Sequence, residues 1–235
     1  MKRFVLLAPR RSGTSLLISS LNSHPQIHCY KYVFHRRRLL RYFFYFEKSG
    51  TPFFKYWSTS IKRQIDYIFR RKHLIDAFLT ELYESGNDPK AVGVRIIYPQ
   101  EYPEVLEWVI ENDVSVIHLI RENFLKSIVY HSTSKTEPVV HLSPHLLEKR
   151  LAARLNQIET YRAMFKDKRY CEVSNEAFVA NPELETRRML DFLGVDQSMP
   201  LTLGLQKQNP ELADVLENYR EIAETFKGTI FEKYL

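Results

Sequence analysis

A short polar segment with two cations and four small residues follows the first apolar run of the chain. Residues 4–8 are apolar, and after Pro9 the chain continues with Arg10, Arg11, Ser12, Gly13, Thr14 and Ser15. When a buried strand turns directly into a helix, the first backbone N–H groups of the helix lack partners, and with the helix dipole they attract an anion. Arg11 adds a permanent charge with a planar donor fork. The segment therefore predicts a phosphate or sulfate site. The alternative interpretation is an ordinary turn capped by Ser12.

The polar segment differs from the loop that binds nucleoside triphosphates. That loop has the pattern G-x-x-x-x-G-K-[ST]. Here the first glycine is missing, and no lysine precedes Thr14. A nucleotide kinase or NTPase is therefore a weaker hypothesis, which Mg²⁺-dependent ATP binding would revive.

The elements that must position this segment follow the pattern of a parallel sheet. Apolar runs at 4–8, 26–30, 91–97 and 114–120 are typical of buried strands, and the run at 16–21 is typical of a helix that ends before Pro25. Residues 101–112, with Pro103 in the first turn, read as a helix between two of these strands, which makes a βαβ crossover. We predict an α/β fold with a central parallel sheet flanked by helices.

The second half of the sequence is mostly helical. Residues 143–165 form a long amphipathic pattern that begins with a Ser cap and a Pro at the first helical position. A short strand at 169–173 and a helix at 181–194, stopped by Gly194, follow. The 235 residues contain no internal repeat or low-complexity linker, so one domain spanning 1–235 is predicted.

Composition restricts the classes of partner and compartment. The net charge is +6, which favours an anionic partner. No run of 18 apolar residues is present and no secretory signal is visible, so we expect a cytoplasmic protein. Cys29 and Cys171 are too few for a disulfide framework and are expected to be buried thiols, with a disulfide as the alternative. No His or Cys spacing is typical of a metal site, and His118 is expected to be a core histidine.

Residues 31–72 have an unusual composition. They carry twelve Lys or Arg against two acids, with thirteen aromatic residues interleaved. Helical hairpins with inward aromatics and solvated arginines would explain this composition. A lid that binds the acceptor or contacts an anionic membrane surface peripherally would explain it as well. No RNA-binding motif accompanies the charges, so no nucleic-acid partner is expected.

Several segments resemble the sulfotransferases that use 3′-phosphoadenosine 5′-phosphosulfate (PAPS). "RRSGTSLL" followed by "LNSHPQI" resembles their 5′-phosphosulfate-binding loop, and "VIHLIRENFLKSIV" resembles their second donor signature. "VGVRIIYPQ", "EVSNEAFVANPELETRRMLDFLGV" and the tail "LQKQNPELADVLENYREIAETFKGT" also resemble segments of bacterial members. The resemblance spans nearly the whole chain and implies the P-loop-like sulfotransferase fold, with a helical insertion at 31–90 as an acceptor lid.

The resemblance assigns roles to individual residues. It implies that Thr14 and Ser15, with the backbone N–H groups of Ser12 and Gly13, hold the 5′-phosphate, and that Arg11 stabilises charge on the leaving group. Arg121 would hold the 3′-phosphate, helped by Lys207 of the tail. The serine usual in the second signature is absent at Val129 and Tyr130, so Ser127 or Ser132 would replace it, with Ser127 preferred. The alternative for Arg121 is a strand-end arginine paired with a carboxylate. The implied chemistry needs the donor PAPS and no metal.

The general base does not follow from the resemblance. Many bacterial members have a glutamate at the position that Tyr32 occupies here. His35 is the preferred replacement, because an imidazole titrates near neutral pH. His28 and Glu47 are the alternatives, and Tyr32 itself would need a strongly lowered pKa.

The sequence thus predicts a sulfotransferase that moves a sulfuryl group from PAPS to a hydroxyl of a carbohydrate, glycolipid or small metabolite. A catalytically impaired protein that binds the donor, and a membrane-surface adaptor built around 31–72, are the alternative hypotheses. The sequence gives no oligomeric state.

Overall fold

The computed structural model describes most of the chain. The described residues are 1–34, 36–38, 45–47, 50–84, 89–98, 102–133, 137–202, 204 and 210–235, with the backbone alone at 36–38 and 45–47. His35 and Lys207, two of the predicted site residues, lie outside the described residues, as does the side chain of Glu47.

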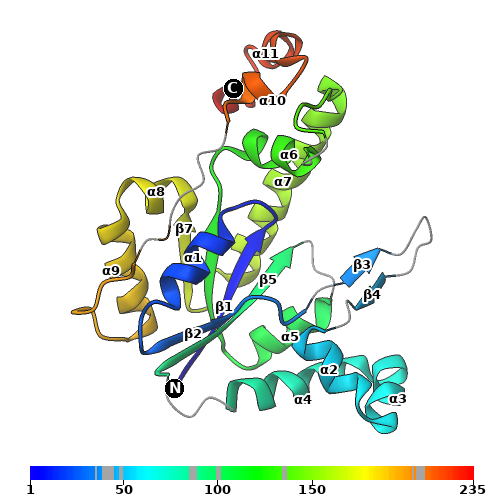
Figure 1. Cartoon of the computed structure of the whole chain (residues 1–235), viewed down its shortest axis with the longest axis vertical. Helices are drawn as coiled ribbons and strands as arrows, with labels where there is room; N and C mark the ends of the chain where they lie inside the picture. Colours follow the sequence, from blue (N-terminus) through cyan, green and yellow to red (C-terminus); the bar gives the residue numbers. More distant parts are fainter. Residues whose placement is uncertain are drawn as a thin grey trace.

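A five-stranded parallel sheet forms the centre of the molecule (Figure 1). The strand order is β2-β5-β1-β6-β7, and all neighbouring strands are parallel. The bounds are β1 Lys2–Pro9, β2 Ile27–Tyr30, β5 Ala91–Tyr98, β6 Ser115–Ile120 and β7 Tyr170–Ser174. The predicted parallel sheet is confirmed, and every predicted strand is present within one or two residues of its predicted bounds.

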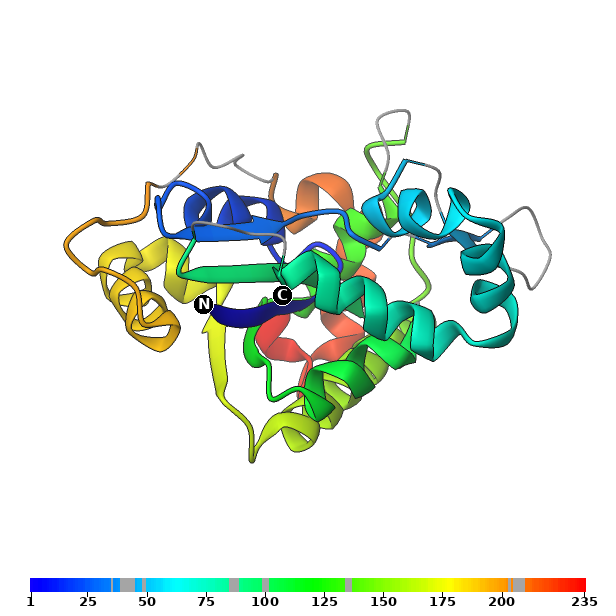
Figure 2. The ribbon, with the colours of Figure 1, turned by 90° about the horizontal axis from the view of Figure 1, so that it is seen from below.

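The helices cover the two faces of this sheet. Val5 and Leu7 of β1 face one apolar cluster, whereas Phe4, Leu6 and Ala8 face the other, because successive side chains of a strand point to opposite sides. The first cluster includes residues of α4 (Arg71–Glu84), α5 (Pro103–Glu111) and α7 (Pro144–Phe165). The second includes residues of α1 (Thr14–Leu21) and α9 (Pro182–Leu193). Figure 2 shows α1 and α7 on opposite faces.

The remaining elements lie outside the sheet and the helices that cover its faces. They are β3 Arg36–Arg38, β4 Tyr45–Glu47, α2 Pro52–Ser58, α3 Ile61–Phe69, α6 Phe124–Ser132, α8 Asn175–Ala180, α10 Leu212–Val215, α11 Tyr219–Phe226 and the 3-10 helix η1 Glu232–Tyr234. The C-terminal end packs on α6, where the Phe124 and Tyr234 rings lie 5.2 Å apart and Asn123 Nδ2 donates to the Tyr234 carbonyl at 3.0 Å.

The expectation that 31–90 is helical throughout is wrong in part. β3 and β4 form a two-stranded antiparallel sheet, with Arg36 opposite Glu47 in register, and β5 begins at Ala91 after a non-helical Pro89–Lys90 step. Aromatic residues favour extended backbone as readily as helix, so the composition did not distinguish the two. The helices of this segment are α2, α3 and α4, which we call the helical arm (residues 52–84).

Inward aromatic residues hold the helical arm to the sheet. Phe53 of α2 is fully buried, and its ring lies 5.1 Å from Phe78 of α4 and 5.4 Å from Tyr102. Phe34 contacts the same three rings at 5.0 to 5.7 Å. The hypothesis of inward-packed aromatics in residues 31–72 is therefore confirmed for Phe34 and for Phe53 of α2, which pack against α4. The helix between α2 and α4, α3, has no buried residue.

Two further predictions, on the start of α7 and on the two cysteines, can be compared with the structure. Ser143 stands at the N-cap of α7 as predicted, but its side chain makes no capping hydrogen bond. Cys29 and Cys171 are free and buried, on the two edge strands of the sheet, which confirms buried thiols and excludes the alternative disulfide. Over the described ranges, no helix combines the length and apolar character needed to cross a membrane.

Candidate functional site

The segment 10–15, which we call the anion loop, joins β1 to α1 in an unusual backbone conformation. Arg11 has a φ of 64° and Gly13 a φ of 90°, so two left-handed residues flank Ser12. Such alternation turns successive N–H groups toward one point, as in anion-binding nests. Gly13 is the N-cap of α1 and no side chain caps this end. Within the described chain, the backbone N–H groups of Gly13, Thr14 and Ser15 have no acceptor. The loop therefore offers free donors to an anion.

The side chain of Ser12 stabilises the anion loop from within. This side chain is fully buried, and its hydroxyl donates to the Pro9 carbonyl at 2.8 Å. The N-cap of α1 is Gly13, so the alternative in which Ser12 caps the helix is wrong. Ser12 fixes the shape of the loop, and the groups it leaves available to a ligand are those of its backbone. Arg11 and Ser15 are exposed, whereas Thr14 is buried.

The close packing of α8 explains why position 13 is glycine. A Cβ at this position would overlap the Asn175 carboxamide, and the φ of 90° is a conformation that L side chains rarely adopt. Asn175 begins α8, directly after β7. The junction between β7 and α8 therefore packs directly against the anion loop.

Arg121 lies beside the anion loop. It follows β6, and its Nη1 donates to the Arg11 carbonyl at 3.4 Å. Its Nε is buried without a hydrogen bond and lies 3.6 Å from Glu176 Oε1. Glu176 in turn accepts from the backbone N–H groups of Glu122 and Asn123, at 2.8 and 3.3 Å. The carboxylate of the alternative interpretation is therefore present, and it orients an arginine whose donors are incompletely used.

Ser127 connects α6 to the anion loop. It is buried, and its hydroxyl donates to the Arg10 carbonyl at 3.0 Å. A hydroxyl has a single proton, so Ser127 would have to release this carbonyl in order to donate to a phosphate. Ser132 donates to the Ile128 carbonyl at 3.2 Å and accepts from Arg150 at 3.4 Å. Both serines named from the sequence therefore have backbone partners in this state.

Two further arginines, which the sequence analysis missed, lie near the same edge of the sheet. Arg95 of β5 sits over the Tyr32 ring, 4.5 Å from its centroid, and its Nε is buried without a hydrogen bond. Arg154 of α7 has a buried Nη1 without a partner in the described chain. Burial lowers the pKa of both guanidinium groups.

A periodic signal could have revealed Arg154. The buried residues of α7 are Leu147, Leu151, Ile158, Tyr161 and Phe165, and the half-buried Arg154 completes their spacing of three or four residues. An arginine in such a series needs an explanation, because a buried charge is costly unless it has a partner.

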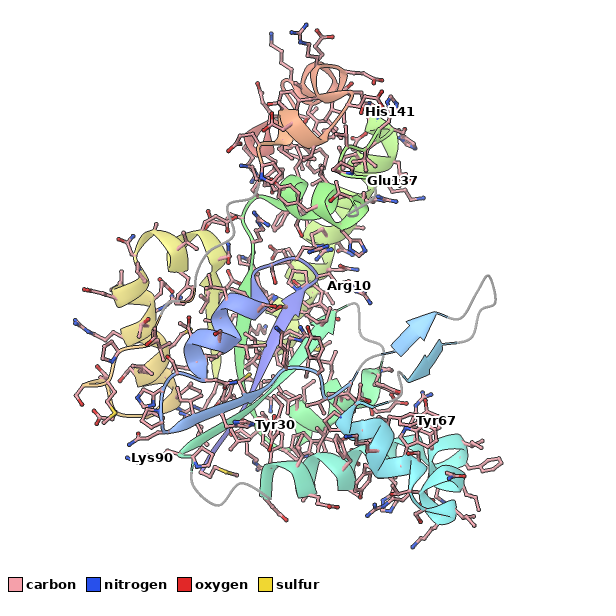
Figure 3. The ribbon with its side chains drawn as sticks, in the orientation of Figure 1. Arg10, Tyr30, Tyr67, Lys90, Glu137 and His141 are labelled. Atoms are coloured by element: carbon pink, nitrogen blue, oxygen red, sulfur yellow. The ribbon has the colours of Figure 1, made fainter. Side chains whose placement is uncertain are left out.

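The arginines at this edge of the sheet help to lower the pKa of one histidine. The pKa of His131 is lowered, first by burial and then by the charges of Arg10, Arg11, Arg154 and Arg150. Figure 3 shows Arg10 projecting from the carboxyl end of β1 on the side away from α9. Positive charge therefore converges on the anion loop from β1, β6 and α7.

The described candidates for the general base lie in different places. His28 is exposed on β2 and level with Arg3 across the sheet, six residues before Pro9. At about 3.3 Å per residue, this puts His28 about 20 Å from the loop. Tyr32 lies under Arg95 and is half exposed. Of these two, only Tyr32 is near the carboxyl end of the sheet.

His118 is a core histidine with both ring nitrogens satisfied, as predicted. Its Nδ1 lies 2.6 Å from the Tyr170 hydroxyl and its Nε2 lies 3.1 Å from the Tyr98 hydroxyl. Tyr170 donates its only proton to Glu172 at 2.8 Å, so Nδ1 must donate to Tyr170 and Nε2 must accept from Tyr98. Burial lowers the pKa of His118 to about 4. Arg162 completes the chain with two bonds to Glu172, at 2.6 and 2.7 Å.

Comparison with known proteins identifies the fold. No family model matches the sequence, and no curated protein matches it significantly. Two solved structures are similar over 97% of this chain: a sulfotransferase from Alicyclobacillus acidocaldarius and the sulfotransferase domain from the curacin biosynthetic pathway. The first is 18% identical, with a TM-score of 0.51 and 93% of its own chain covered. The second is 14% identical, with a TM-score of 0.53 and 98% covered. The chain therefore has the α/β fold of the bacterial sulfotransferases.

Proposed function

We propose that this protein is a PAPS-dependent sulfotransferase. One observation carries the proposal: the free N–H groups of residues 13–15, Arg11 and Arg121 all lie at one edge of a sheet whose fold is that of sulfotransferases. An ATP-binding loop would need a lysine before Thr14, and the chain has Gly13 there.

Each charged group of the donor has a fitting partner in this proposal. The N–H groups of the anion loop, with the Thr14 and Ser15 hydroxyls, bind the 5′-phosphate. Arg121, whose buried Nε lacks a hydrogen bond, binds the 3′-phosphate, with Lys207 and Ser127 as further contacts. Gly13 allows the left-handed backbone that turns the N–H groups of the loop toward one point.

The chain contributes positioning and charge stabilisation to the transfer. The acceptor oxygen forms a bond to sulfur while the bond between sulfur and the 5′-phosphate oxygen breaks, and the hydroxyl proton passes to a base. Arg11 remains protonated throughout and stabilises the negative charge that develops on the leaving oxygen. His35 is the proposed base, and Tyr32 beside Arg95 is the alternative.

The rest of the proposal concerns the acceptor and the domain. The acceptor is a hydroxyl of a carbohydrate, glycolipid or small metabolite. Residues 1–235 act as one sulfotransferase domain in the cytoplasm, in which 31–90 covers the acceptor. Support for the lid comes from Tyr32, which leads from the sheet edge into this segment.

Calorimetric titration with 3′-phosphoadenosine 5′-phosphate (PAP), the desulfated donor, tests the proposal. We expect a micromolar dissociation constant, about −8 kcal/mol, and at least about tenfold weaker binding in Arg121→Ala, which loses a charge-assisted contact. Arg220→Ala on α11 is the matched control, because it removes an exposed arginine that has no partner in the described chain. ATP with Mg²⁺ is titrated in parallel. Binding of ATP alone, or equal loss in both variants, would contradict the proposal.

Donor binding without turnover is the second candidate function. Tyr32, in place of the usual glutamate, favours it. Release of PAP from PAPS, measured with a panel of sugar and phenol acceptors, distinguishes the two. Turnover above the rate without protein supports the enzyme, whereas tight PAP binding with no release supports the binding protein.

A further inference from the structure

Helix α3 turns its apolar face away from the protein. Its nine residues, Ile61–Phe69, include none that is buried. Four large apolar side chains are exposed: Ile61 at 77%, Ile65 at 53%, Ile68 at 70% and Phe69 at 78%. Scattered apolar residues on a surface are normal, but four on one short helix form a continuous patch.

The spacing of these residues places them on one stripe. At about 100° per residue, positions 61, 65, 68 and 69 fall within an arc of about 100°. Arg63 and Tyr67 lie on the opposite side of the helix by the same geometry. A helix that served only the core of this domain would have the reverse orientation.

Contacts on the inner side fix this orientation. The Tyr67 ring stacks on Trp57 at 4.4 Å, and its hydroxyl lies 3.3 Å from that of Tyr102. Arg63 lies over the Tyr56 ring, 3.8 Å from its centroid, and donates to the Tyr56 carbonyl at 3.3 Å. The outward apolar stripe is therefore held in place by aromatic packing beneath it.

Basic residues flank the stripe on α3, and a further one lies on the preceding helix. Lys62 is next to it on the helix, Arg70 is the C-cap, and Lys55 lies one helix earlier. All three are exposed and have no ion-pair partner in the described part of the chain. Asp66 is the one acid of α3. An apolar stripe with a basic margin complements an anionic lipid surface, whereas a second copy of the same face would bring like charges together.

We propose that α3 docks this protein on an anionic lipid bilayer. Ile61, Ile65, Ile68 and Phe69 enter the interface between headgroups and acyl chains, and Lys55, Lys62 and Arg70 meet the anionic headgroups. Figure 1 shows α3 at the outer end of the helical arm, far from α6 and the anion loop, so the surface acts independently of the donor site.

Sedimentation with vesicles tests the docking surface. The full chain is mixed with vesicles of phosphatidylcholine alone or with 30% phosphatidylserine (about the anionic fraction that attracts basic segments). We expect binding to the anionic vesicles, and loss of about a hundredfold in the double variant Ile65→Ser, Phe69→Ser. Leu184→Ser, Met199→Ser is the matched control, because both residues are exposed elsewhere. The double variant Lys62→Gln, Arg70→Gln should weaken binding about thirtyfold.

Three outcomes would overturn the proposal. The first is no binding of the unmodified chain to anionic vesicles, and the second is equal loss in the control variant. The third is self-association, in sedimentation without vesicles, that disappears in Ile65→Ser, Phe69→Ser, since this would assign the face to a second copy. Circular dichroism shows whether each variant folds, and PAP titration of the same samples reports the donor site separately.

Discussion

The carboxyl edge of the sheet and the helical arm both combine arginines with aromatic rings, but they use them in opposite ways. At the sheet edge, Arg95, Arg121 and Arg154 are partly buried and hold N–H groups without hydrogen bonds. On α3 and its C-cap, Lys62 and Arg70 are exposed and the apolar residues point outward. Fixed, desolvated donors suit a small anion with a defined shape. Mobile surface charges around an apolar stripe suit an extended anionic surface.

Removal of one charge from each region tests this contrast most strongly. Arg11→Ala should lower PAP release from PAPS about 10³-fold or more, because it removes the charge that stabilises the leaving oxygen. Lys62→Ala removes a charge from α3 and should leave turnover with a soluble acceptor unchanged. Steady-state rates of both variants, with unfolding curves to confirm the fold, provide the measurement. Wild-type turnover in Arg11→Ala would refute the assigned role.

The buried network under the sheet edge should make stability depend on pH. The pKa of His118 is about 4 in the folded chain and about 6.5 when exposed. Between these values the unfolded chain binds more protons, so the free energy of unfolding falls as the pH drops from 6.5 to 4. The total loss is up to about 3 kcal/mol. Urea unfolding at pH 7 and pH 5 should show about 2 kcal/mol of this loss, since pH 5 lies part of the way through the window.

The variant His118→Gln isolates that effect, because it keeps one donor and one acceptor but cannot titrate. The difference between wild type and variant should shrink as the pH falls. A difference that stays constant from pH 7 to pH 5 would show that His118 does not titrate as its burial implies. The helical arm has no such buried imidazole among its described residues.

Two glycines with the same φ compare the anion loop with the turn that precedes the helical arm. Gly13 and Gly50 both have a φ of 90°, but only at Gly13 would a Cβ overlap another side chain. Gly50→Ala should cost about 1 kcal/mol for the left-handed backbone. Gly13→Ala should cost about 1 to 2 kcal/mol more, and should abolish PAP binding as Asn175 is displaced. If thermal unfolding showed the same loss of stability in Gly13→Ala and Gly50→Ala, the anion loop would accommodate the added methyl group without strain.

The smallest effect is expected on the inner side of α3. Arg63→Ala removes the contact with the Tyr56 ring and a surface pair with Glu81 at 3.9 Å. Each is worth under about 1 kcal/mol. Urea unfolding of Arg63→Ala should show that the free energy of unfolding falls by about 1 kcal/mol. The affinity for PAP should be unchanged. A loss of several kcal/mol would indicate that α3 folds as part of the core.

The sequence predicted the regions where side-chain periodicity determines structure. Buried runs such as 4–8 and 114–120 predicted the parallel strands, and in the structure the pairing of β1 with β6 brings Arg121 beside the anion loop. The β3–β4 hairpin was missed because aromatic and basic residues suit strands and helices alike. The alternative in which Ser12 caps α1 failed because a sequence shows the residue type but does not show the left-handed backbone that moves the cap to Gly13.

Arg95 and Arg154 were not predicted as site residues for a common reason. Arg95 and Arg154 come from a strand and a helix that are about sixty residues apart in sequence, and only tertiary packing brings them to the same edge. Arg154 was recognisable in principle as a charged residue in an apolar helical stripe. The buried Nε of Arg95 was not, because a single arginine in a strand is compatible with an exposed face.

The central place of β1 has a consequence for how the chain is made. β1 is the first strand to be synthesised, yet its two neighbours are β5 and β6, which begin at residues 91 and 115. Contacts over such separations form late, since a long loop must close before they are made. Ligands of the anion loop can therefore assist only the last steps of folding. A nascent chain that ends before residue 91 carries the whole loop sequence with no sheet to hold it.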